Sequence, residues 1–203
     1  MQFFDINLMP GQAEFISLIL VSGLIMLIAM LWVIRIRKHA DARMLKTTLG
    51  KHAEAVERDV VLSDGVEGFL FADYLLLMPG KIVAMKTMSE KGVIFGAGDI
   101  DEWTCVENNR TGKFRNPLIE VRAFAHQVKH VLGFDAVEAW VLFDRQSEFP
   151  KGVPEDVLQL GILDEELKAR YGSAEVQVEA RRLWDQLIDT VHADKKRLEA
   201  ELR

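Results

Sequence analysis

The sequence has very little cysteine: Cys105 is the single one among its 203 residues. One thiol cannot form an internal disulfide, so a disulfide framework is excluded, which agrees with a reducing compartment such as the cytosol. The chain also lacks internal repeats and low-complexity tracts. With 49% hydrophobic and 28% charged residues it has the composition of a folded protein. Its length allows one domain with an appendage.

Positive charge is absent from the first 34 residues. Residues 15–34 carry no charged side chain at all, and as a helix they would extend about 30 Å, the thickness of a bilayer core. A cleaved signal peptide is the alternative, but it would begin with a positive region, whereas Asp5 and Glu14 precede the apolar run. We therefore expect residues 15–34 to form a retained transmembrane helix.

Cations follow the apolar run directly, at Arg35, Arg37, Lys38, Arg43 and Lys46. By the positive-inside rule, residues 1–14 are extracytoplasmic and the rest of the chain is cytoplasmic, as in a single-pass protein of the inner cell membrane. The basic juxtamembrane segment, residues 35–50, either sets this topology alone or also binds anionic lipid head groups. The whole chain has a net charge of −6 and a pI near 5.4, which argues against strong nonspecific DNA binding.

Hydrophobic periodicity after residue 40 predicts an α/β protein, with a mixed sheet flanked by helices. A helix is expected from residue 41 to about 58, and another over 117–132, with Asn116 as its N-cap and Pro117 in its first position. Strands are expected at 68–77, 82–88, 92–97, 102–106 and 136–144. From Phe149 onward the pattern predicts helices and turns only, ending in a long helix that begins at Ser173.

Two charges interrupt the apolar hairpin "ADYLLLMPGKIVAMKTM". Asp73 and Lys86 lie on its two strands, where an unpaired charge would be costly, so we expect them to approach each other. Alternation along a strand places Ala84 and Lys86 on one face. Metal-dependent phosphodiester hydrolysis requires at least two acidic ligands for Mg²⁺ and a positive group, and this hairpin supplies one acid and the amine.

An ordered set of motifs around this hairpin resembles the nuclease-related domain (NERD), a branch of the PD-(D/E)xK nuclease superfamily. The set comprises "ADY" at 72–74, "MPGK" at 78–81, "VAMK" at 83–86, "GVIFG" at 92–96, Trp103 and "FRNPL" at 114–118. The resemblance extends over about a hundred residues of the chain, taken here as 51–148, and members of this family commonly have a membrane segment before the domain. Residues 149–203 would form a C-terminal helical extension.

The resemblance implies a restriction-endonuclease-like core, a divalent metal such as Mg²⁺, and hydrolysis of DNA or RNA. Asp73 matches the first metal-binding acid and Lys86 matches the lysine. Ala84 stands where the family has the glutamate of its Glu-x-Lys pair, and Glu120 stands where the family usually has glutamine. The implied catalytic residues are Asp73 and Lys86, and the resemblance fails at Ala84.

Other acids are candidates for the missing metal ligand. Glu54 and Glu57 are expected on the helix before the core, and Glu120 on the helix after it, although each is more often a solvated surface carboxylate. With such a replacement, the protein is an active metal-dependent nuclease and hydrolase. Without it, the fold is a degenerate module that binds a nucleic acid, or a protein through its C-terminal helix.

Overall fold

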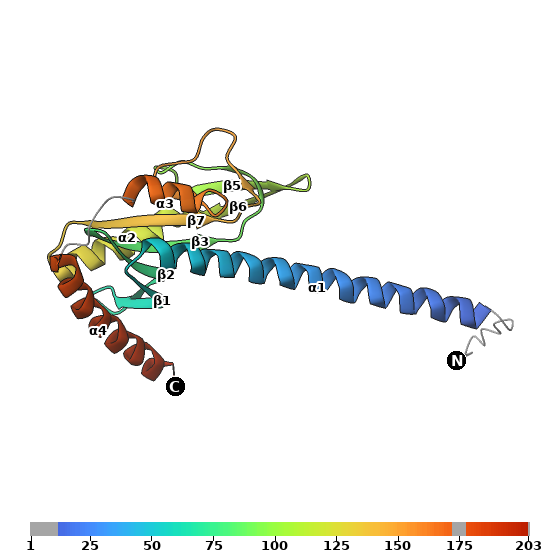
Figure 1. Cartoon of the computed structure of the whole chain (residues 1–203), viewed down its shortest axis with the longest axis horizontal. Helices are drawn as coiled ribbons and strands as arrows, with labels where there is room; N and C mark the ends of the chain where they lie inside the picture. The colour runs from blue at the N-terminus through green and yellow to red at the C-terminus, as the bar shows by residue number, and fades with distance from the viewer. Residues whose placement is uncertain (1–11, 172–177, 203) are drawn as a thin grey trace. The chain divides into compact units, whose positions relative to one another are not determined.

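The computed structural model describes residues 12–171 and 178–202 of the chain (Figure 1). They divide into two compact units, one up to Met44 and one from Leu45 onward, and each is described by itself. Helix α1, Gln12–His52, contributes to both units. The expected N-cap at Ser173 lies outside the described residues.

The first unit contains the apolar part of α1. Side chains are described for residues 18–33, and all of them are exposed. In the described part of the chain, no helix reaches the combination of length and apolarity that crossing a membrane requires. The transmembrane helix predicted for residues 15–34 is therefore not supported. The side chains of residues 15–17 and of Ile34, which belong to the predicted segment, lie outside the described residues.

Helix α1 ends earlier than the sequence predicts. It stops at His52, and strand β1, Ala55–Ser63, follows almost at once. Glu54 and Glu57 are therefore not helical, which corrects the prediction of a helix up to residue 58. The amide of Glu54 donates to the carbonyl of Leu77 at 2.8 Å, so pairing with the next strand overrides the helical spacing of the apolar residues.

The predicted hairpin is confirmed as β2, Phe69–Met78, and β3, Lys81–Met88. Pro79 and Gly80 form its turn, and Gly80 has a φ of +72°, a conformation that favours glycine. The antiparallel ladder pairs Met78 with Lys81 at the turn and continues to the pair of Tyr74 and Met85.

The larger sheet has the order β1-β2-β3-β7-β9 and is mixed, as predicted. Strands β1, β2 and β3 are antiparallel, whereas β3, β7 (Val137–Phe143) and β9 (Val157–Gln159) are parallel. Strand β9 contradicts the prediction that no strand occurs after Phe149. It is too short to show a hydrophobic alternation in the sequence.

A smaller sheet has the order β6-β5-β4-β8. It contains β4 (Gly92–Phe95), β5 (Glu102–Glu107), β6 (Arg110–Arg115) and β8 (Ser147–Glu148). Neither β6 nor β8 was predicted. Trp103 joins this sheet to the core, since its fully buried ring stacks on Phe143 with 5.9 Å between centroids. A Cβ atom on Gly96 would come within 2.2 Å of that ring, so only glycine fits there.

Helix α2, Pro117–Leu132, is confirmed with its predicted cap. The side-chain oxygen of Asn116 accepts from the amide of Leu118 at 2.9 Å. The side-chain nitrogen of Asn116 donates to the carbonyl of Ile100 at 2.8 Å, and this fixes the loop after β4 against the start of α2. Gly133 ends the helix in the left-handed conformation, with a φ of +60°.

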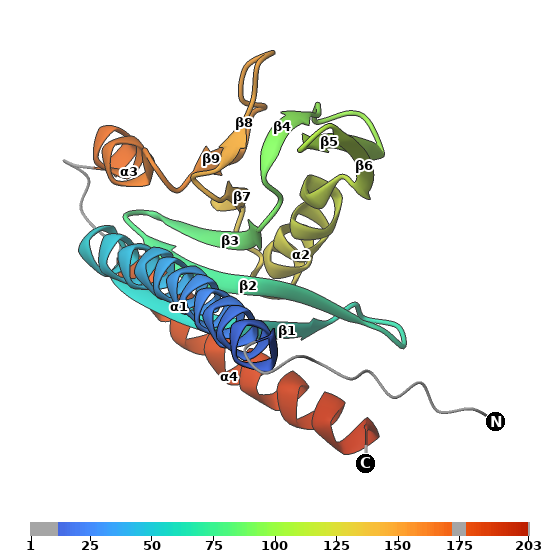
Figure 2. The ribbon, with the colours of Figure 1, turned by 90° about the vertical axis from the view of Figure 1, so that its right-hand side faces the viewer.

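Both faces of the larger sheet are covered. Helices α2 and α4, Val178–Glu201, pack on one face, where Phe124 and Trp184 belong to the same apolar core. Helix α3, Leu163–Tyr171, covers the opposite face together with Leu45 and Leu49 from the end of α1. Figure 2 shows α4 running along β1.

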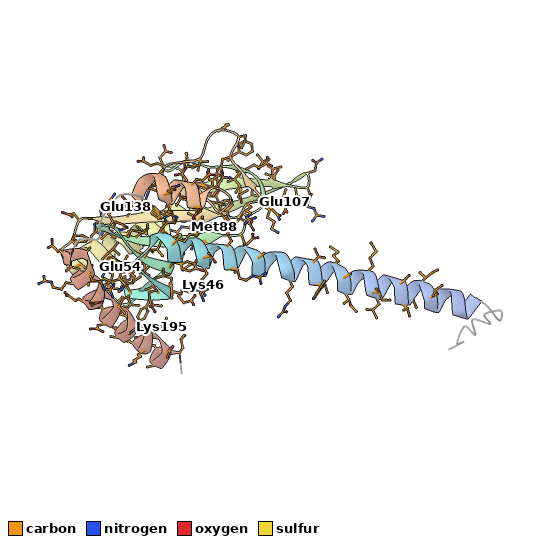
Figure 3. The ribbon with its side chains drawn as sticks, in the orientation of Figure 1. Lys46, Glu54, Met88, Glu107, Glu138 and Lys195 are labelled. Atoms are coloured by element: carbon orange, nitrogen blue, oxygen red, sulfur yellow. The ribbon has the colours of Figure 1, made fainter. Side chains whose placement is uncertain are left out.

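Helix α4 is also attached to β1 by polar contacts (Figure 3, where Glu54 and Lys195 are labelled). The carboxylate of Asp194 accepts from the amide of Ser63 at 2.8 Å, and Lys195 Nζ donates to the carbonyl of Asp59 at 3.3 Å. The C-terminal helix predicted from the sequence is therefore part of the unit that begins at Leu45.

The end of α1 is linked to α3 by a carboxylate whose pKa predicts a dependence of stability on pH. Hydrogen bonds from His52 at 3.0 Å and Lys51 at 3.3 Å lower the pKa of Asp164 below its ordinary value. A lowered pKa in the folded state stabilises the fold above the unfolded pKa of about 3.9, and this contribution is lost as the pH falls further.

We expect Asp164→Asn to be less stable than the wild type at neutral pH. The difference should shrink below about pH 4 in urea titrations. Asp185→Asn is the control, and an equal change in both variants would contradict the assignment.

Candidate functional site

The position of Ala84 decides the chemistry of the hairpin. Ala84 is fully buried, and it pairs with Leu75 of β2 on one side and with Ala139 of β7 on the other. Its methyl group belongs to the apolar core beneath α2. No carboxylate is therefore available at the position where the resemblance requires the glutamate.

Asp73 lies where β2 separates from β3. The regular ladder between these strands ends at Tyr74 and Met85. The next amide of β3 on the β2 side, that of Thr87, therefore needs another acceptor. Asp73 Oδ2 accepts from both the amide and the hydroxyl of Thr87, each at 2.6 Å. The predicted metal-binding acid thus provides a hydrogen-bond acceptor where the ladder has ended. No sequence pattern indicated the role of Thr87.

Lys86 is paired with Glu120 rather than with Asp73. Its ammonium donates to the carboxylate of Glu120, which stands in the first turn of α2. The Lys86 side chain is 29% exposed and that of Glu120 is 42% exposed, so the pair lies at the edge of the core. The described residues contain no ion pair between Asp73 and Lys86, which corrects the expected pairing. The structure therefore brings together two of the predicted site residues, Lys86 and Glu120.

Glu54 and Glu57 are engaged elsewhere. Arg181 of α4 pairs with Glu54, and His192 of the same helix lies 3.5 Å from Glu57. Both acids therefore serve the contact between α4 and β1. Nothing in this arrangement directs them towards Lys86.

The side-chain oxygens that could act as metal ligands at this site do not fit Mg²⁺. Mg²⁺ needs anionic oxygen ligands in near-octahedral geometry. One oxygen of Asp73 accepts from Thr87, one oxygen of Glu120 accepts from Lys86, and the side chain at position 84 has no oxygen. Across residues 12–171 and 178–202, no group of three or more His, Cys, Asp or Glu side chains is arranged to hold a metal ion.

The lone thiol does not provide an alternative nucleophile. Cys105 is half-buried, and its Sγ donates to the carbonyl of Lys91 at 2.9 Å. Burial, followed by the nearby Glu107 and Glu90, raises the pKa of the Cys105 thiol above its ordinary value. At neutral pH the thiol therefore stays protonated and unreactive.

Comparison with known families gives a match that includes the whole hairpin and the start of α2. The model of the family described as NERD, the nuclease-related domain, matches residues 37–144, more than half of the chain. The chain belongs to the nuclease-related domain family. No curated protein and no solved structure matches it significantly.

The family motifs that this NERD domain keeps are explained by its architecture. Gly96 makes room for the ring of Trp103, and Asn116 holds the loop after β4 against the start of α2. The motif that it lacks is the carboxylate of the Glu-x-Lys pair, since position 84 is alanine.

The hydrogen bonds of Asp73 predict a measurable effect on stability. Asp73→Ala leaves the amide of Thr87 without its acceptor, and we expect the free energy of unfolding to fall by about 1–3 kcal/mol. Asp73→Asn keeps an acceptor oxygen and should cost less. Thr87→Val removes the hydroxyl alone and serves as the control for the amide. Urea denaturation measures all three, and an unchanged stability of Asp73→Ala would contradict this role.

Proposed function

We propose that this NERD domain is a catalytically degenerate module that binds a macromolecule instead of cleaving one. The observation that carries the proposal is Ala84, whose methyl group fills the core where a nuclease of this kind needs a carboxylate. A lone aspartate holds Mg²⁺ poorly, because the ion requires more than one anionic contact from its site.

The state of Lys86 supports the same conclusion. In phosphodiester hydrolysis, a positive group orients water or stabilises the negative charge on the oxygens around the phosphorus. Glu120 neutralises the ammonium of Lys86 and links β3 to α2. The amine therefore has a structural partner that would compete with a substrate for its charge.

An active nuclease is the second candidate function. It is favoured by the position of Glu120, whose carboxylate lies beside the lysine and could replace the lost glutamate. This alternative assigns catalytic roles to Asp73 and Lys86, with Glu120 as a relocated acid. It requires that Glu120 bind the metal ion while its carboxylate lies beside Lys86.

We also propose that the chain is attached to a membrane by residues 15–34, with the NERD domain on the cytoplasmic side. The support is the charge-free sequence, the cations that follow it, and the exposure of every side chain from residue 18 to residue 33. A helix that is apolar on every side is typical of a buried core helix or a membrane span.

Restoring the family residues tests whether the site is degenerate. The wild type should not cleave single- or double-stranded DNA or RNA with Mg²⁺ or Mn²⁺. The double variant Ala84→Glu, Glu120→Gln supplies the missing ligand and frees Lys86. We expect it to gain metal-dependent cleavage and a Mg²⁺-dependent rise in melting temperature.

The matched control is Ala84→Gln with Glu120→Gln, which has the same size without the charge and should stay inactive. Circular dichroism verifies that each variant is folded. Cleavage by the wild type that disappears in Lys86→Ala would exclude the degenerate module and establish the active nuclease.

Membrane attachment is tested by fractionation of cells that produce the full chain. The wild type should remain in the membrane pellet after carbonate extraction. Leu24→Lys with Ile28→Lys places charges in the middle of the segment, each at a cost of about 2.5–3.5 kcal/mol, and should release the protein. Val66→Lys, which is remote in sequence, should not. A wild-type protein found in the supernatant would refute the attachment.

A further inference from the structure

A groove lies between the last turns of α4 and the neighbouring part of β1 and β2, with a cavity volume of about 270 Å³. Asp73, the acid retained from the nuclease motif, is part of its lining. Helix α4 is outside residues 37–144, so the family match does not account for this feature. Lys195, on the α4 side, is labelled in Figure 3.

The groove has exposed apolar side chains from both of its walls. Phe71 of β2 is 57% exposed, and Leu202 at the end of α4 is 78% exposed. Leu198 lies one turn before Leu202 and therefore on the same side of the helix. Exposed apolar groups that gather around a cavity are typical of an interaction site.

The charges of the groove are mostly negative. Asp59, Asp73 and Glu199 contribute three carboxylates, and Lys195 contributes one ammonium. That ammonium already donates to the carbonyl of Asp59, so it is engaged within the protein. Phosphate groups of a nucleic acid would meet repulsion here, whereas lysine or arginine side chains would be attracted.

The cavity is small. Its volume of about 270 Å³ lies near the lower end of the range of about 300–1,000 Å³ that is usual for small-molecule sites. It has room for an apolar side chain inserted from a partner. Apolar anchors that fill such pockets contribute most of the binding free energy in protein interfaces.

We propose that the groove beside Asp73 binds a basic amphipathic protein segment, which inserts an apolar side chain between Phe71 and Leu202 and places a lysine or arginine near Asp59 and Glu199. This inference rests on the proposed function of a binding module and specifies its partner as a protein rather than a nucleic acid. Asp73 would then serve two roles, as the acceptor for Thr87 and as part of an acidic wall.

Binding of defined probes to the full chain in zwitterionic detergent micelles tests the proposal. The probes are a fluorescein-labelled helical peptide of leucine and lysine, the same peptide with glutamate in place of lysine, and labelled oligodeoxythymidine. Anisotropy is measured against empty micelles. We expect the leucine–lysine peptide to bind and the other two probes not to bind.

Variants locate the binding site. Phe71→Ser and Glu199→Lys should each weaken the leucine–lysine peptide by about tenfold or more, because they remove the apolar wall and reverse one charge. Val66→Ser is the matched control, since Val66 is 80% exposed but does not line the groove. Its affinity should equal that of the wild type.

The other outcomes overturn the proposal in distinguishable ways. Equal binding of the acidic peptide, no binding, or no response to Phe71→Ser would exclude the groove as a basic-segment site. Binding of oligodeoxythymidine alone would identify a nucleic-acid module, which keeps the proposed function but not its partner. A dimer that Phe71→Ser dissociates in sedimentation would show that a second copy of the chain occupies the groove. Metal-dependent cleavage of the oligonucleotide would refute the proposed function itself.

Discussion

Strand β3 is hydrogen-bonded along both edges, to β2 and β7, and both faces of its sheet are covered by helices. Every side chain of this strand must therefore be apolar or have a polar partner. Residues 82–85 meet the requirement by being apolar and fully buried, and Lys86 meets it through Glu120. A glutamate at position 84 would need a partner of its own, such as a metal ion. Alanine at this position provides no ligand for a metal ion and needs no polar partner.

The two residues of the hairpin that match the nuclease motif both make structural contacts. The carboxylate of Asp73 in β2 accepts hydrogen bonds from Thr87 in β3, beyond the end of the backbone ladder. Lys86 attaches the sheet to α2 through its ion pair with Glu120. Both contacts stabilise the hairpin on which an active site would depend. An aspartate and a lysine in a nuclease-like motif are thus insufficient to identify a nuclease, because their hydrogen-bond partners determine what they can do.

The sequence predicted the elements whose local signals are strong. The Pro-Gly turn of the hairpin and the Asn116 cap of α2 depend on residues close in sequence, and both are where the patterns placed them. The predicted end of the helix at about residue 58 was wrong, because the apolar residues before Arg58 fit a helical spacing as well as a strand. The pairing of Lys86 with Glu120 could not be foreseen, since it joins residues 34 positions apart whose approach is set by how α2 crosses the sheet. The hydrogen bonds to Thr87 are equally tertiary, as they exist only because β2 and β3 diverge.

The contacts of Asp194 and Lys195 with the backbone of β1 hold α4 in place and also cover an edge of the sheet. Strand β1 is an outer strand of the larger sheet, so one row of its amides and carbonyls has no neighbouring strand. Such rows can recruit strands of other molecules and start aggregation. Helix α4 occupies part of this row with its own side chains, at Ser63 and Asp59. Helix α4, which lies beyond the family match, therefore protects the edge strand from pairing with other molecules. Without it, residues 37–144 would leave this edge of β1 open to aggregation.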